Sequence, residues 1–187
     1  MAVRSDLVGR VRSRVDDGRG GRLPRSPAGV VEGQGVVATV TATIKATPAA
    51  VHAVLADGWA YAGWVVGASH VRAVQGDWPA VRSRLFHASG TWPLLMEDHT
   101  QVEQLDPGRR LVLLAHGGRL GDARIELSLT PDGPTGGHTR VTMVETPVAG
   151  PGKWVHNPIA DAVLTRRNTE ALTRLGCLVE HPTTPTK

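Results

Sequence analysis

The sequence predicts an α+β fold in which a curved antiparallel sheet holds one long helix. Short segments typical of strands fill most of the chain from residue 36 to residue 146, and only two short helical pieces interrupt them. A single long amphipathic segment, 158–180, then closes the chain. A lone helix after so many strands buries its apolar face on the concave side of their sheet. This arrangement tends to leave a cavity between helix and sheet, where small apolar molecules bind.

The expected elements are one strand, two helical pieces, six further strands and the closing helix. Residues 36–45 alternate β-branched side chains, which indicates a strand. Thr47 and Pro48 have the pattern of an N-cap and a first helical residue, so a helix is expected over 48–57, and 58–64 forms a second piece. The other strands are expected at 65–76, 83–92, 94–104, 111–117, 122–130 and 139–146. Turn residues at 106–108 and 131–137 connect them as hairpins.

Charge divides the chain into an arm and a domain. Residues 1–35 are rich in glycine and carry seven arginines against four acidic residues, which indicates a flexible basic arm. A short amphipathic helix that contacts a membrane or a partner is the alternative for this arm. The other 152 residues hold 14 basic and 13 acidic side chains, so we expect neither a phosphate-binding face nor a nucleic-acid partner. We expect a domain over 36–180 and a disordered tail over 181–187.

Cysteine content and hydropathy predict a soluble cytoplasmic protein. Cys177 is the only cysteine, so the chain can form no internal disulfide, and its apolar neighbours indicate a buried structural thiol. No apolar run reaches about 18 residues. The eight histidines lack the spacing of a metal site, and no phosphate loop, nucleophile elbow or dinucleotide fingerprint occurs. We therefore expect no metal and no cofactor.

Strand alternation places two carboxylates on the face that should be apolar. In 94–104 the inward set includes Met96 and Asp98, while the residues between them form a solvated face. In 139–146 the inward set includes Met143 and Glu145. Asp98 and Glu145 are thus predicted to point toward the cavity.

The apolar seam of the closing helix contains a third polar position. Leu164 lies on this seam, Asn168 interrupts it, and Arg167 stands at its edge. A buried polar group without a partner costs about 1–3 kcal/mol. Two interpretations follow: Arg167 or Asn168 contacts Asp98 or Glu145 and ties helix to sheet, or these groups anchor a ligand. Further lining residues are expected to be Trp64, Phe86, Met96 and Met143.

The order of elements resembles the START-like (SRPBCC) superfamily, and more narrowly its polyketide cyclase/dehydrase and lipid-transport group. The resemblance rests on the strand and helix over 40–57, Tyr61-Ala62-Gly63-Trp64, residues 107–114, the hairpin 125–145 and Arg166-Arg167-Asn168 in the closing helix. It covers 36–180 and implies a helix-grip fold, a seven-stranded antiparallel sheet wrapped around the C-terminal helix with a deep cavity for hydrophobic molecules. It carries over no set of catalytic residues.

Three functions are compatible with these observations. The first is a carrier or sensor that binds a lipid-like or polyketide-like molecule in the cavity. The second is a polyketide cyclase or dehydratase, with Asp98 or Glu145 as the base and Arg167, Asn168 or His87 as the hydrogen-bond donor. The third is an interaction module that uses the basic arm on an acidic partner or a membrane. Neither an oligomeric state nor the ligand's identity follows from the sequence.

Overall fold

The computed structural model describes residues 37–91, 94–118, 121–134, 136–150 and 158–182. The expected arm at 1–35 lies outside the described residues, as does the tail beyond Pro182. Within the described part, no helix has the length and apolar character needed to cross a bilayer.

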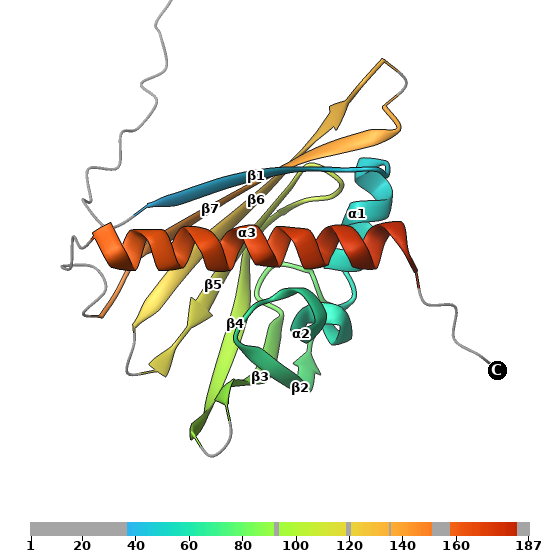
Figure 1. Cartoon of the computed structure of the whole chain (residues 1–187). Coiled ribbons are helices and arrows are strands. Elements are labelled where there is room, and N and C mark those ends of the chain that lie inside the picture. The colour runs from blue at the N-terminus through green and yellow to red at the C-terminus, as the bar shows by residue number, and fades with distance from the viewer. Residues whose placement is uncertain (1–36, 92–93, 119–120, 135, 151–157, 183–187) are drawn as a thin grey trace, which may run out of the picture. The chain divides into compact units, whose positions relative to one another are not determined.

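Seven antiparallel strands form one sheet in the spatial order β1-β7-β6-β5-β4-β3-β2 (Figure 1). The chain enters on β1 and crosses to the far edge at β2. From there it returns strand by strand through hairpins, so β7 lies beside β1. The strands are β1 (Ala38–Ile44), β2 (Ala68–Gln75), β3 (Arg84–Thr91), β4 (Leu94–Asp106), β5 (Arg110–His116), β6 (Asp122–Asp132) and β7 (His138–Pro147). The seven expected strands are confirmed, with ends shifted by a few residues.

The first helix, α1 (Pro48–Leu55), begins as the sequence predicts. The Thr47 hydroxyl accepts a hydrogen bond from the Ala50 amide at 3.3 Å, and Pro48 occupies the first turn. The helix ends two residues before the expected boundary because Asp57 caps the next element instead. Its carboxylate accepts from the Trp59 amide at 2.9 Å. A short 3₁₀ turn, η1 (Gly58–Ala60), and α2 (Tyr61–Trp64) follow.

The second strand begins later than expected, at Ala68 instead of residue 65. The Val65 amide still donates to the Tyr61 carbonyl at 2.9 Å, so it closes α2. Gly67 then has a φ of +102°, a conformation that side chains other than glycine rarely adopt. The residues between α2 and β2 therefore form a turn, and this turn borders the candidate site described below.

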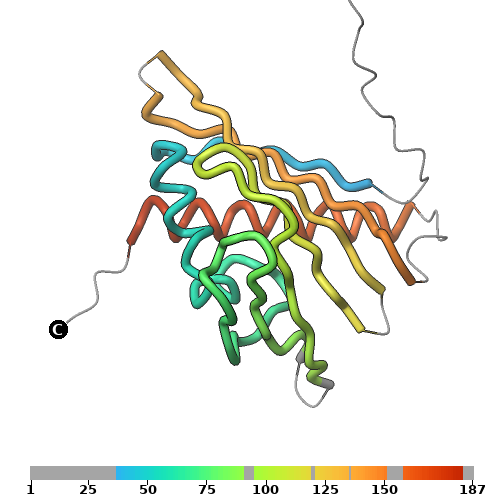
Figure 2. The backbone as a smooth tube through the Cα atoms, turned by 180° about the vertical axis from the view of Figure 1, so that it is seen from behind, coloured from blue at the N-terminus to red at the C-terminus, as the bar shows by residue number. Residues whose placement is uncertain are grey.

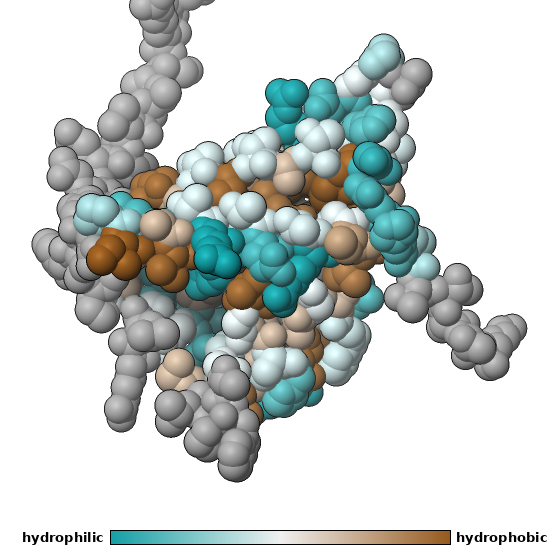
Figure 3. All heavy atoms as spheres, in the orientation of Figure 1, coloured by the Kyte–Doolittle hydropathy of each residue, from teal (hydrophilic) through white to brown (hydrophobic). Residues whose placement is uncertain are grey.

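The closing helix, α3 (Pro158–Glu180), has the bounds that the sequence predicts and lies across one face of the sheet (Figures 1 and 2). Its C-terminal half is the buried half, with Leu172, Leu175 and Val179 in the same core cluster as Ile44 of β1. Its N-terminal half exposes Ile159 and Val163. Figure 3 shows apolar side chains at one end of α3. Core packing therefore holds one end of α3 tightly. The sheet opposite the other end is free to border a cavity.

Candidate functional site

A cavity of about 460 Å³ lies between α3, α2 and the strands β3 to β7. The helices contribute Tyr61 and Trp64 from α2 and Leu164 from α3, while Ile125 and Met143 come from the sheet. Several glycines and alanines also border the cavity. An apolar pocket of this size with a few polar groups is typical of small-molecule sites.

Nine of the ten site residues expected from the sequence line this cavity. They are Trp64, His87, Met96, Asp98, Met143, Glu145, Leu164, Arg167 and Asn168. They come from five separate elements, α2, β3, β4, β7 and α3. The tertiary structure therefore brings together residues that are up to 104 positions apart in the chain.

Phe86 is the exception, because its side chain belongs to the other face of the sheet. Leu85 before it is fully buried and His87 after it lines the cavity, so strand alternation turns Phe86 away. Its ring stacks instead on His99 of β4, with centroids 5.7 Å apart. The expectation that Phe86 lines the cavity is therefore wrong. Alternation along β3 was the signal that could have excluded it.

Glu145 and Arg167 pair with each other. The Arg167 Nη2 group donates to both carboxylate oxygens of Glu145, each at 2.5 Å. Glu145 is 5% exposed, whereas the Arg167 side chain keeps 42% of its surface in contact with solvent. This ion pair joins α3 to β7. It matches the first of the two interpretations from the sequence, in which Arg167 or Asn168 contacts Asp98 or Glu145 and ties the helix to the sheet.

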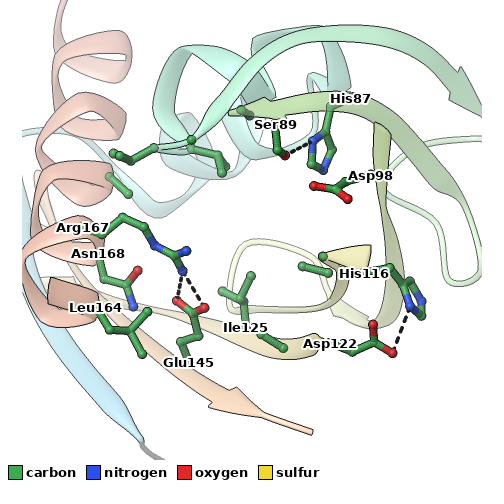
Figure 4. Close-up of a pocket in the computed structure, with 18 of the residues that line it drawn as sticks. His87, Ser89, Asp98, His116, Asp122, Ile125, Glu145, Leu164, Arg167 and Asn168 are labelled. Atoms are coloured by element: carbon green, nitrogen blue, oxygen red, sulfur yellow. Dashed lines mark hydrogen bonds and ion pairs between the residues drawn. The ribbon is translucent and has the colours of Figure 1, made fainter. Parts of the chain in front are cut away.

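Asp98 and Asn168 have no such partner. Asp98 is 8% exposed and Asn168 is 2% exposed, and neither side chain hydrogen-bonds to any described residue. The two residues lie on opposite sides of the cavity, Asp98 on β4 and Asn168 on α3 (Figure 4). Buried carboxylates and amides nearly always have hydrogen-bond partners. These two groups are therefore available to a molecule inside the cavity.

A chain of hydrogen bonds runs along the wall beside Asp98. Ser89 Oγ bonds to His87 Nδ1 at 3.2 Å, and His87 Nε2 bonds to the Thr100 hydroxyl at 3.2 Å. Thr100 Oγ1 also bonds to the Tyr61 hydroxyl at 2.9 Å. Burial lowers the pKa of His87 below its ordinary 6.5, against the opposing effect of Asp98, so the ring is neutral at pH 7. Burial also raises the pKa of Tyr61 to about 12.

Sequence reasoning did not assign Ser89 or Thr100 to the site as polar groups. Thr100 lies on the inward face expected for its strand, but a threonine in a strand carries no signal of a network. The cross-strand register, which places His87 opposite Asp98 and Leu85 opposite Thr100, brings the Thr100 hydroxyl to the imidazole. Ser89 lies two residues after His87 on the same face of β3.

A second histidine, His116, also borders the cavity. His116 Nδ1 lies 3.1 Å from a carboxylate oxygen of Asp122, and its ring stacks on His99 with centroids 4.2 Å apart. Within the described ranges, no three histidine, cysteine or acidic side chains come together as a metal site.

The fold and the pocket together define the class of this protein. A seven-stranded antiparallel sheet against a long C-terminal helix, with short helices after the first strand, is the helix-grip fold of START-like proteins. The chain belongs to the family described as "Polyketide cyclase / dehydrase and lipid transport", whose model matches residues 36–180. The resemblance seen in the sequence is thereby confirmed.

Solved structures support the same fold at low sequence identity. A protein from Thermus thermophilus is 14% identical, with a TM-score of 0.62 over 79% of this chain and 99% of its own. A START superfamily protein from Mycobacterium smegmatis is 16% identical, with a TM-score of 0.60 over 79% and 99%. The Zhui aromatase/cyclase from a Streptomyces species is 16% identical, with a TM-score of 0.58 over 80% and 96%. No curated protein matches this chain.

Proposed function

We propose that this protein binds a hydrophobic small molecule, lipid-like or polyketide-like, in the cavity between α3 and the sheet, and acts as a carrier or sensor. The cavity itself supports this proposal most strongly, because it is largely apolar and large enough for a small organic molecule. We assign the activity to the cytoplasm, since the single cysteine gives no sign of an oxidising compartment.

The expected affinity is modest. Burying roughly 300 Å² of apolar ligand surface at about 25 cal/mol/Å² contributes about 7 kcal/mol before losses. Loss of rigid-body freedom and imperfect pairing of polar groups reduce this gain. We therefore expect micromolar or weaker binding of a simple apolar ligand.

Native mass spectrometry of the purified protein, combined with a cavity-filling variant, tests this function. Leu164→Trp places a large ring in the cavity, whereas Val163→Trp places the same ring on the exposed side of α3. We expect a co-purified small molecule on the wild type and on Val163→Trp, and its loss from Leu164→Trp. Equal occupancy of the two variants would show that the ligand binds elsewhere.

A second candidate function is a polyketide cyclase or dehydratase, and the free carboxylate of Asp98 favours it. Such a reaction needs a base for an acidic proton between two carbonyls, and a donor for the developing enolate. Glu145 is held by Arg167, so Asp98 is the carboxylate available as base. The Asn168 amide across the cavity is the available donor.

Turnover of a poly-β-ketone substrate by amide variants tests this candidate. Asp98→Asn should abolish cyclisation while the substrate still binds, and Asp98→Asn with Glu145→Gln should be equally inactive. A double variant with unchanged turnover would rule out acid–base chemistry by these carboxylates and leave the carrier role.

A further inference from the structure

Two polar side chains of the cavity wall need partners that the described protein does not supply. Asp98 lies opposite His87 in the β3–β4 pairing, but both nitrogens of that ring are already bonded to Ser89 and Thr100. Asn168 Nδ2 needs an acceptor, but the neighbouring Arg167 on α3 offers only donors, and the Glu145 carboxylate accepts from Arg167. Each potential partner is therefore engaged elsewhere, and a bound molecule is left to satisfy Asp98 and Asn168.

The chemistry of these two groups indicates what that molecule carries. An ionised carboxylate only accepts hydrogen bonds, so Asp98 needs a donor. The buried Nδ2 of Asn168 needs an acceptor, such as a carbonyl oxygen. Because the two residues lie on opposite sides of the cavity, one molecule that meets both has its donor and its acceptor at separate positions (Figure 4).

The charged side chains of the cavity wall indicate which head group the ligand carries. Arg167 is neutralised by Glu145, and Asp122 is bonded to His116. Among the described residues that border the cavity, Asp98 is the one carboxylate without such a partner. A ligand with an anionic head group, such as a fatty acid, would meet this negative charge without a free cation to balance it. An ammonium group would lose its hydration in a largely apolar cavity, which is costly.

We propose that the ligand is a neutral, oxygenated molecule that donates a hydroxyl hydrogen bond to Asp98 and accepts one from the Asn168 amide through a carbonyl. This inference rests on the proposed binding function and selects hydroxylated ketones over hydrocarbon chains and fatty acids. Arg167 and Glu145 then hold α3 in place and do not contribute the specificity.

Matched naphthalene probes test each contact separately by calorimetry. Naphthalene and 2-naphthol differ by one hydroxyl, and 2-ethylnaphthalene and 2-acetylnaphthalene differ in the carbonyl oxygen. A hydrogen bond to a charged group is worth at least tenfold in affinity, and one between neutral groups about fivefold. We therefore expect the wild type to prefer 2-naphthol over naphthalene by about tenfold, and the ketone over 2-ethylnaphthalene by about fivefold.

Two substitutions should remove these preferences independently. Asp98→Leu should abolish the hydroxyl preference and leave the ketone preference unchanged. Asn168→Leu should abolish the ketone preference and leave the hydroxyl preference unchanged. Because each variant is its own control on the other probe pair, a general loss of folding cannot produce this crossed pattern.

The outcomes separate this inference from the binding function on which it rests. If naphthalene and 2-ethylnaphthalene bind but the wild type shows neither preference, the function stands and the inference is overturned. If none of the four probes binds, both are overturned. If 2-naphthoate or 2-(aminomethyl)naphthalene binds more tightly than 2-naphthol, the site prefers an anion or a cation to a neutral hydroxyl. That result would also overturn the inference.

Discussion

Replacing Arg167 with methionine should lower the free energy of unfolding by about 2 kcal/mol, because it leaves the Glu145 carboxylate buried without its partner. Removing one member of a fully buried ion pair costs about 3–5 kcal/mol, and an exposed pair is worth about 0.2–1 kcal/mol. Glu145 is 5% exposed but the Arg167 side chain is 42% exposed, so solvent screening places this pair between those limits. For a domain of this size, about 2 kcal/mol lowers the melting temperature by roughly 4–8 °C.

Urea unfolding followed by tryptophan fluorescence measures this change, and two further variants identify its cause. Arg166→Met removes an exposed arginine one position earlier on α3 and should change stability by less than about 0.5 kcal/mol. In the double variant Glu145→Gln with Arg167→Met no charge is left buried, so most of the lost stability should return. If Arg167→Met behaves like Arg166→Met, or if the double variant is as unstable as Arg167→Met, the reasoning about the buried carboxylate is refuted.

Three other predictions concern the cavity wall. Asn168→Leu should raise the free energy of unfolding by about 1 kcal/mol, because it removes a buried amide that has no described partner. Calorimetry should then show a melting temperature higher by roughly 2–4 °C. A melting temperature below that of the wild type would mean that the amide has a hydrogen-bond partner in the free protein. Tyr61 is the only tyrosine, and its pKa is raised to about 12, so absorbance at 295 nm should show no ionisation of the folded protein near pH 10, where the urea-unfolded chain titrates. The unfolded state then loses its proton first, so stability should fall as the pH rises from about 10 toward 12, and Tyr61→Phe should remove this dependence. The pKa of His87 lies below 6.5, so the neutral ring stabilises the fold fully above pH 6.5, and this stability is lost as the pH falls through the lowered pKa. An NMR titration midpoint for His87 above 6.5 would contradict the downward shift of the pKa.

Side-chain periodicity in the sequence predicted part of the candidate site, because it shows which side chains share one face of a strand or helix. Alternation along 94–104 and 139–146 placed Asp98 and Glu145 inward, and the helical seam placed Asn168 on the helix face that turns toward the sheet. All three border the cavity. The same periodicity excludes Phe86 from the cavity lining once Leu85 is known to be buried. The sequence of one strand alone, however, does not show which of its two faces is turned toward the cavity. Cys177 likewise was expected to be buried, and the structure exposes it because Gly176 and Val179 form the face of α3 turned to the sheet.

Local interactions determined the elements of this protein, because an N-cap at Thr47, alternating strands and an amphipathic closing helix are all properties of neighbouring residues. Only the tertiary structure decided which polar groups satisfy one another. Arg167 reaches Glu145 and not Asp98, and His87 bonds to Thr100 of the neighbouring strand, because strand order and register set these distances across the chain. Asp98 and Asn168, the two cavity groups left without a partner among the described residues, therefore result from the packing of α3 on the sheet and could not be predicted from either segment alone.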